Sequence, residues 1–179
     1  APPLGGEEAL DDAVLQGVVA EDHEPAARPE QVERRGQSGL LDLRFMAPDA
    51  DIIVLPETFT SGFSNDALSQ AEAMDGPTVA WLREQSAALN AVITGSVQIR
   101  EGDAVFNRML LAAPDGSIQH YDKRHLFRMA GEHERYAAGT DKIIVEYKGW
   151  RICPLVCYDL RFPELYRALK SDLLLVPSA

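Results

Sequence analysis

The run of apolar residues at 52–55 constrains this chain most, because Ile-Ile-Val-Leu in succession is typical of a strand buried on both faces. Such a strand belongs to a sheet that has other layers above and below it. An Asp-Gly-Pro sequence at 75–77 predicts a helix with Asp75 as its N-cap and a proline in its first turn, carrying Leu82 and Leu89 on one side. Strands and helices therefore alternate, and the sequence predicts an α/β layered domain.

The rest of the chain continues this pattern, with short apolar segments separated by turn sequences. Turns are expected at 114–116 (Pro-Asp-Gly) and at 148–149 (Lys-Gly), and a long polar loop is expected from about 123 to 141. Pro163 lies near the start of a short helix predicted over 162–169. Further strands are expected at 91–99, 105–112, 118–121, 143–147, 151–156 and 173–176.

Residues 1–46 differ in composition from the rest of the chain. They contain no Ile, Lys, Trp or Tyr, and ten acidic against four basic residues. Alanine, proline and glutamate crowd together over 21–33, a stretch too polar to order itself by burial, although Val18 and Val19 suit a short strand or part of a helix. We therefore expect an atypical N-terminal segment at 1–46 and a folded domain at 47–179.

The overall composition disfavours several classes of protein. A formal net charge of −11 and a pI of about 4.7 argue against a nucleic-acid binder, which needs Lys and Arg for phosphates. The sequence has no run of 18 apolar residues, so no membrane span is expected. No secretory leader pattern is visible, and two cysteines cannot make a disulfide scaffold, which fits a reducing, cytoplasmic setting.

Two charged residues follow predicted strands, where α/β folds place ligands. Glu57 comes after the buried strand and a proline, and partial burial there would raise its pKa and suit it to proton transfer. The alternative for Glu57 is a cap of a helix or turn. Lys123 follows a later strand and precedes an apolar Leu-Phe pair, so a fixed ammonium group there could stabilise an oxyanion. A solvated surface lysine is the alternative reading.

Cys157 ends an apolar strand and precedes polar residues and a helix that starts at a proline. A sharp strand-to-helix turn exposes a side chain and offers backbone N–H donors, as in nucleophile elbows, and the positive end of the helix would favour a thiolate. The alternative is an inert buried cysteine, a description that suits Cys153 in mid-strand. Their spacing along one strand excludes a disulfide between the two cysteines unless the strand bends.

No metal ion or cofactor is expected. His120, His125 and His133 lie near Glu132 and Glu134 in the sequence, but their spacing matches no zinc pattern. No glycine-rich phosphate loop is flanked by the required strand and helix.

The order of the glutamate, the lysine and the cysteine resembles that of the nitrilase, or carbon–nitrogen hydrolase, superfamily. The three matching words are LPETFTSGF at 55–63, YDKRHLF at 121–127 and CPLVCYDLRFPELYR at 153–167. MDGPTVAWL at 74–82, the Asn-Arg pair at 107–108 and RMAGEHERYAAG at 128–139 add to the match. Together they are similar to the omega-amidase branch, which hydrolyses the side-chain amide of short α-keto acid monoamides.

The resemblance implies a Glu-Lys-Cys triad that works through a thioester intermediate. Glu57 would be the general base and Cys157 the nucleophile. Lys123 and the backbone N–H of Tyr158 would hold the oxyanion.

The resemblance also implies a second carboxylate in the loop after the lysine. Counting back from Gly139 gives Glu132, with Glu134 as the competitor two residues on. Its expected work is to orient Lys123 and assist the base.

A small carboxylate-bearing amide as substrate would need a cation or hydrogen-bond donors for its carboxylate. The candidates to bind it or line its pocket are Phe63, Arg128, Arg135, Tyr136, Tyr158 and Arg161. A structural contact, for example with Asp159, is the preferred alternative for Arg161. The family also implies a homodimer or larger homo-oligomer, with neither nucleic acid nor membrane as a partner.

The fold implied by the resemblance is an α-β-β-α sandwich, here in partial form. Residues 1–46 do not show the family's opening strand and helix, and the family continues through further elements after the last predicted strand. Two alternatives to an active amidase follow from this. The chain could be an inactive fragment of the same fold, or a thiol redox-sensing module that uses Cys157.

Overall fold

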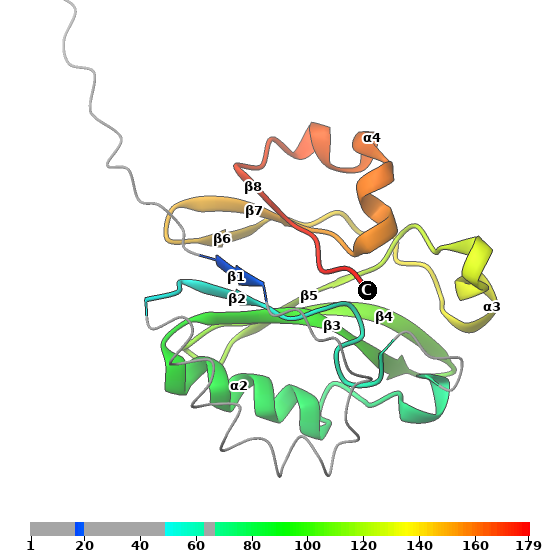
Figure 1. Cartoon of the computed structure of the whole chain (residues 1–179), viewed down its shortest axis with the longest axis horizontal. Helices are drawn as coiled ribbons and strands as arrows, with labels where there is room; N and C mark the ends of the chain where they lie inside the picture. The colour runs from blue at the N-terminus through cyan, green and yellow to red at the C-terminus, as the bar shows by residue number, and fades with distance from the viewer. Residues whose placement is uncertain (1–16, 20–48, 63–66) are drawn as a thin grey trace, which may run out of the picture.

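A computed structural model of the chain describes residues 17–19, 49–62 and 67–179. Its larger sheet has five strands in the order β1-β2-β3-β4-β5. These are β1 Gly17–Val19, β2 Ile52–Val54, β3 Val92–Glu101, β4 Ala104–Ala112 and β5 Ile118–Asp122. The first three strands run parallel, whereas β3, β4 and β5 pair antiparallel. The apolar run at 52–55 therefore contains β2, which lies between β1 and β3 (Figure 1).

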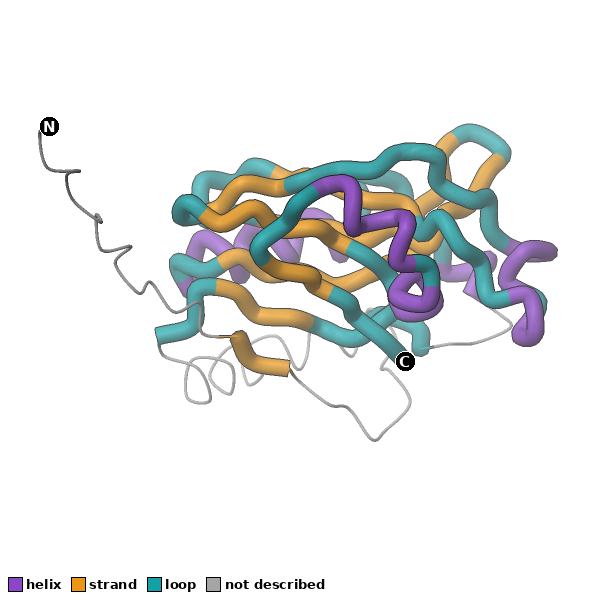
Figure 2. The backbone as a smooth tube through the Cα atoms, turned by 90° about the horizontal axis from the view of Figure 1, so that it is seen from above, coloured by secondary structure: helices purple, strands orange, loops and turns teal. Residues whose placement is uncertain are grey.

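A smaller sheet of three strands packs against one face of the larger sheet (Figure 2). In this sheet β6 is antiparallel to β7, and β7 is parallel to β8. Ile52 and Met109 of the larger sheet share one buried cluster with Ile152 and Leu175 of the smaller sheet. The main core therefore lies between the two sheets. The strands are β6 Val145–Tyr147, β7 Trp150–Pro154 and β8 Leu173–Leu175.

Helices cover the outer faces of the paired sheets (Figure 1). On the larger sheet, α2 Pro77–Leu89 places Leu82 in a buried cluster with Ile53. On the smaller sheet, α4 Pro163–Tyr166 contributes Leu165 to the cluster that β7 lines. The layers therefore follow the α-β-β-α order implied by the sequence.

The predicted strands after the first are confirmed as β3 to β8, and the helix predicted at 162–169 is α4 followed by a short 3₁₀ turn. The polar loop expected from about 123 to 141 is less irregular than predicted, because it holds a 3₁₀ turn and one short α-helix. The remaining elements are η1 Ala67–Gln70, η2 Arg128–Ala130, α3 Glu132–Arg135, η3 Cys157–Arg161 and η4 Arg167–Leu169.

The start of α2 corrects one detail of the sequence prediction. Gly76, not Asp75, is the N-cap, and no side chain caps it. Glu72 instead accepts hydrogen bonds from the backbone N–H of Thr78 (2.9 Å) and from its hydroxyl (2.5 Å). A carboxylate beside the first turn stabilises a helix, so the predicted start was right and the predicted partner was wrong.

The strand option for Val18 and Val19 is confirmed as β1, which pairs in parallel with β2. The other residues of the 1–46 segment lie outside the described residues, so its atypical character stays a prediction. Among the described residues, no helix combines the length and the apolar character needed to cross a membrane.

Replacing Leu82, which is 0% exposed, should test the packing of α2 on the larger sheet. Leu82→Ala should lower the free energy of unfolding by about 2–5 kcal/mol, because it leaves a cavity in a closed core. The matched control is Leu160→Ala, at a leucine that is 47% exposed, and it should change stability little. Urea unfolding midpoints measure both effects, and equal losses in the two variants would contradict this packing.

Candidate active site

Glu57 lies just beyond β2, in a turn that is tied to the neighbouring strand. The backbone N–H of Leu55 donates to the carbonyl of Thr94 (2.7 Å), and that of Thr58 donates to the hydroxyl of Ser96 (2.8 Å). Thr58 has a φ of 48°, so the chain turns sharply here. The turn directs the Glu57 side chain inward, where the residue is only 2% exposed.

Lys123 follows β5 and is 1% exposed. Its backbone N–H donates to the carbonyl of Asn107 (2.9 Å), and its own carbonyl accepts from the backbone N–H of Gly139 (3.0 Å). A Cβ on Gly139 would lie 2.2 Å from the carbonyl oxygen of Asp122, so only glycine allows the loop to return this close to β5. The returning loop therefore closes over the lysine.

The ammonium group of Lys123 lies between two buried carboxylates. Its Nζ is 2.8 Å from Glu57 and 2.9 Å from Glu132, which is 0% exposed. Burial alone would lower the pKa of Lys123, but the charges and hydrogen bonds of both carboxylates outweigh burial and raise it. Of the two candidates for the second carboxylate, Glu132 contacts the lysine, whereas the side chain of Glu134 is 75% exposed and lies near His133.

The side-chain amide of Asn107 donates hydrogen bonds to both carboxylates that contact Lys123. Its Nδ2 donates to Glu57 (2.9 Å) and to Glu132 (3.3 Å), and it is fully buried on β4. Asn107 lies in one of the sequence words shared with the family, but no role was predicted for it. A polar Asn-Arg pair within an otherwise apolar predicted strand was the available signal, because asparagine is depleted in strands.

Cys157 is the first residue of η3 and faces the charged cluster from the smaller sheet. Its φ is 43°, a left-handed conformation that L side chains rarely adopt, and its N–H donates to the carbonyl of Pro177 (2.9 Å). The next carbonyl, that of Ser178, accepts from the N–H of Glu57 (3.4 Å). Consecutive carbonyls of one segment thus hold the turns that carry Glu57 and Cys157.

The pKa of the Cys157 thiol is raised, which corrects the expectation that a helix start would favour its thiolate. Burial is the main cause, followed by the negative charge of Glu57 and a hydrogen bond with that carboxylate. The charge of Lys123 and a hydrogen bond from Ser178 act in the opposite direction and are weaker. The element that follows is a five-residue 3₁₀ turn, too short for an appreciable helix dipole.

Cys153 has the properties of a structural cysteine. It is 1% exposed on β7, and burial, with a smaller contribution from the charge of Asp159, raises its pKa to about 11. Both cysteines are free thiols.

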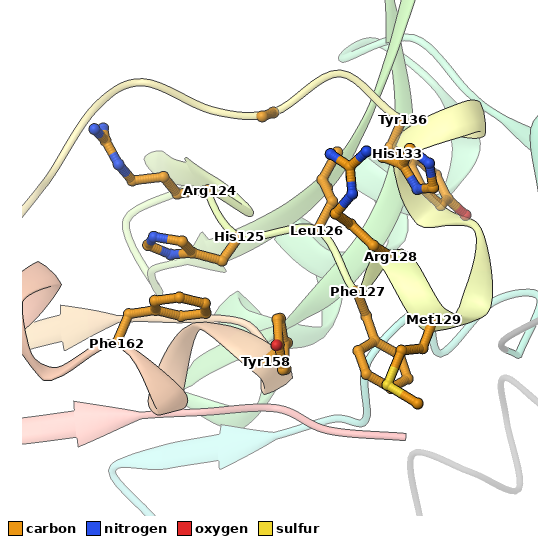
Figure 3. A pocket seen from close by; sticks show the side chains of 11 residues that line it. Arg124, His125, Leu126, Phe127, Arg128, Met129, His133, Tyr136, Tyr158 and Phe162 are labelled. Atoms are coloured by element: carbon orange, nitrogen blue, oxygen red, sulfur yellow. The ribbon is translucent and has the colours of Figure 1, made fainter.

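A pocket of about 540 Å³ opens beside the cluster (Figure 3). Of the predicted substrate residues, Arg128, Tyr136 and Tyr158 line it, whereas Arg161 is exposed on η3 and does not. Phe63 lies outside the described residues. The pocket is lined by Tyr158 but not by Glu57, Lys123 or Cys157 themselves. Its lining residues are Arg124, His125, Leu126, Phe127, Arg128, Met129, His133, Tyr136, Ala138, Tyr158 and Phe162.

Arg135, a candidate to bind the substrate, and His125, one of the histidines considered for a metal site, both have partners within the protein. Arg135 donates to the carbonyl of Ala130 (2.5 Å), a contact within the short helical loop. His125 contacts Asp159, with its Nδ1 2.9 Å from a carboxylate oxygen. Within the described part of the chain, no group of three or more His, Cys, Asp and Glu side chains could hold a metal ion.

Comparison with known proteins identifies the family. The model of the carbon-nitrogen hydrolase family matches residues 39–173. The chain belongs to this family. It is 54% identical over 117 residues to omega-amidase YafV of Yersinia enterocolitica, which covers 63% of this chain and 44% of that protein. It is 36% identical over 121 residues to 2-oxoglutaramate amidase of Bacillus subtilis, covering 66% and 47% respectively.

Solved structures of carbon-nitrogen hydrolases share the fold. XC1258 of Xanthomonas campestris, a superfamily protein with an arsenic adduct in its active site, superposes with a TM-score of 0.77 at 51% identity. The match covers 87% of this chain and 62% of that one. The chain spans slightly less than half the length of the omega-amidases it matches.

Substituting Glu57 should shift the reactivity of the Cys157 thiol. Glu57→Gln removes the negative charge that helps to raise the thiol pKa, so the pH midpoint of iodoacetamide labelling should move to lower pH. Peptide mass spectrometry would follow labelling, with Cys153 unlabelled in the folded protein. Glu134→Gln, at an exposed carboxylate nearby, is the control and should leave the midpoint unchanged. An unchanged or higher midpoint in Glu57→Gln would contradict the geometry.

Removing the cation should destabilise the fold. Lys123→Met leaves two buried carboxylates without their partner and should cost about 3–5 kcal/mol at neutral pH. The cost should fall as pH is lowered, because the unpaired carboxylates then bind protons. Lys142→Met, at an exposed lysine, is the control. Urea unfolding at two pH values measures the difference, and a loss independent of pH would count against the buried cluster.

Proposed function

We propose that the chain carries the catalytic centre of an omega-amidase-like hydrolase, which cleaves a small carboxylate-bearing amide to a carboxylic acid and ammonia. The observation that carries this proposal is the buried contact of Lys123 with Glu57 and Glu132, together with a Cys157 thiol whose pKa is raised by burial and by the charge of Glu57. A nucleophile, a base within its reach and a fixed cation are the parts that acyl transfer requires.

In the first half-reaction Glu57 takes the proton of the Cys157 thiol as the sulfur attacks the amide carbonyl carbon. Lys123 and the backbone N–H of Tyr158 stabilise the oxyanion, each donor contributing on the order of 3 kcal/mol. Glu57 then returns its proton to the amide nitrogen. The carbon–nitrogen bond breaks, ammonia leaves, and the acyl group remains on Cys157 as a thioester.

In the second half-reaction Glu57 takes a proton from a water molecule, whose oxygen attacks the thioester carbonyl. The carbon–sulfur bond breaks, the carboxylic acid is released, and the proton returns to the sulfur of Cys157. Glu132 and Asn107 act by holding Lys123 and Glu57 in place rather than by touching the reacting atoms.

A 2-oxo acid monoamide such as 2-oxoglutaramate is the substrate that this proposal favours. The support is the similarity to omega-amidases and to a 2-oxoglutaramate amidase. Arg128 lines the pocket, as Tyr158 does, and is the better candidate for the substrate carboxylate than Arg161, which is exposed on η3 and does not line the pocket. Phe63 and Tyr136 remain proposed contacts, and we propose a cytoplasmic homodimer or larger homo-oligomer as the working form.

An ammonia-release assay with 2-oxoglutaramate and 2-oxosuccinamate tests the proposal. The wild-type chain should release ammonia, and Cys157→Ala should reduce turnover by about 10³-fold or more, because the nucleophile is lost. Cys153→Ala is the matched control and should retain turnover, since Cys153 lies in mid-strand.

Absence of ammonia release from folded wild-type protein would overturn the proposal. So would equal turnover by Cys157→Ala. Reversible oxidation of Cys157 by peroxide without amide turnover would favour a thiol redox sensor instead.

A further inference from the structure

A third buried carboxylate, that of Asp159, lies between the two segments that carry Lys123 and Cys157. Asp159 is 0% exposed in η3. Its Oδ2 accepts from the hydroxyl of Tyr121 (2.9 Å) and from the backbone N–H of Val156 (3.2 Å). Its Oδ1 accepts from the backbone N–H of His125 (2.8 Å) and lies 2.9 Å from the Nδ1 of the same residue.

The partners of this carboxylate flank the proposed catalytic residues. Tyr121 lies two residues before Lys123, and His125 lies two residues after it. Val156 immediately precedes Cys157. One side chain therefore connects the end of β5, on the larger sheet, to the turn that follows β7, on the smaller sheet.

Two features make this connection rigid. A buried carboxylate is tolerated only when donors satisfy it, so Asp159 favours the arrangement in which all of its partners converge. The His125 ring also stacks on Phe162, with centroids 3.7 Å apart and planes 8° apart (Figure 3).

The conformation of Cys157 needs such support. A φ of 43° costs free energy for a residue with a Cβ, and it persists only where the surroundings fix it. Asp159 binds the residue before Cys157 twice, because its side chain accepts from the Val156 N–H and its own N–H donates to the Val156 carbonyl (3.0 Å).

We propose that Asp159, together with His125 and Tyr121, is a positioning group that sets the Cys157 turn relative to Lys123. The catalytic consequence rests on the proposed function, whereas the coupling of the two segments does not. Loss of a contact on the β5 side should therefore loosen the Cys157 turn on the other sheet.

Amide hydrogen exchange tests the coupling without any assay of activity. In His125→Ala, peptides that cover 156–160 should exchange at least about fivefold faster than in the wild type, although position 125 lies in a different segment. His125→Asn keeps an N–H donor near the Nδ1 position and should restore most of the protection. Ser86→Ala, which removes a hydroxyl bonded to Ala91 and Ala112, is the control for a buried hydrogen-bond loss elsewhere.

Steady-state kinetics test the catalytic consequence. Asp159→Asn should lower kcat by about tenfold or more with KM within about twofold, because the nucleophile is misplaced and Asp159 does not line the pocket. His125→Ala should lower kcat by a similar factor. His125→Asn should recover activity, and Ser86→Ala should keep the wild-type kcat. Tyr121→Phe removes only the hydrogen bond from the tyrosine hydroxyl to Asp159, so it replaces Asp159→Asn as the test variant if Asp159→Asn fails to fold.

Unchanged exchange at 156–160 in both His125→Ala and Tyr121→Phe would overturn the coupling. Faster exchange with wild-type kcat would overturn the positioning role while leaving the coupling intact. If exchange at 156–160 is faster in the variants but the wild-type protein releases no ammonia, the proposed function alone is overturned.

Discussion

The candidate site depends on the ion pairs that the buried ammonium group of Lys123 makes with two carboxylates. Lys123 lies within hydrogen-bond distance of both Glu57 and Glu132, and all three side chains are almost completely removed from water. Buried carboxylates need a cationic partner to offset the cost of removing their charge from water. The lysine therefore fixes the turn after β2 and the short helix α3 at the same point. Asn107 adds a neutral donor that orients the same oxygens without adding charge.

The sandwich makes this arrangement possible because its two sheets bring strand ends together. Glu57 and Lys123 extend from β2 and β5 of the larger sheet, whereas Cys157 follows β7 of the smaller sheet. Burial, and then the negative charge of Glu57, raise the pKa of the thiol. In the proposed reaction the thiol proton moves first to Glu57 and then to the departing nitrogen.

Local patterns predicted most of the fold, because burial leaves apolar runs such as that of β2 and prolines mark helix starts such as that of α2. The three proposed catalytic residues could be suggested from the sequence because each follows a strand within a recognisable word. Asn107 was assigned no role, and Asp159 was named only as a partner of Arg161, whereas it accepts hydrogen bonds from Tyr121, His125 and Val156. The partners Glu57 of Asn107 and Tyr121 of Asp159 lie 50 and 38 residues away and leave no local pattern. The sign of the Cys157 pKa shift was predicted wrongly, because its main cause is burial of the thiol, which depends on the packing of the two sheets and not on a local pattern.

The segment at 177–178 holds the base and the nucleophile from adjacent carbonyls, those of Ser178 and Pro177. The backbone of Lys123 is bound instead by that of Asn107 and Gly139, outside the 177–178 segment. A small shift of the 177–178 segment would carry the carboxylate and the sulfur together, preserving the path of the proton between them. The same shift would alter their separation from the cation. Because Lys123 also binds Glu57 directly, the position of the 177–178 segment affects the base, the nucleophile and the cation together.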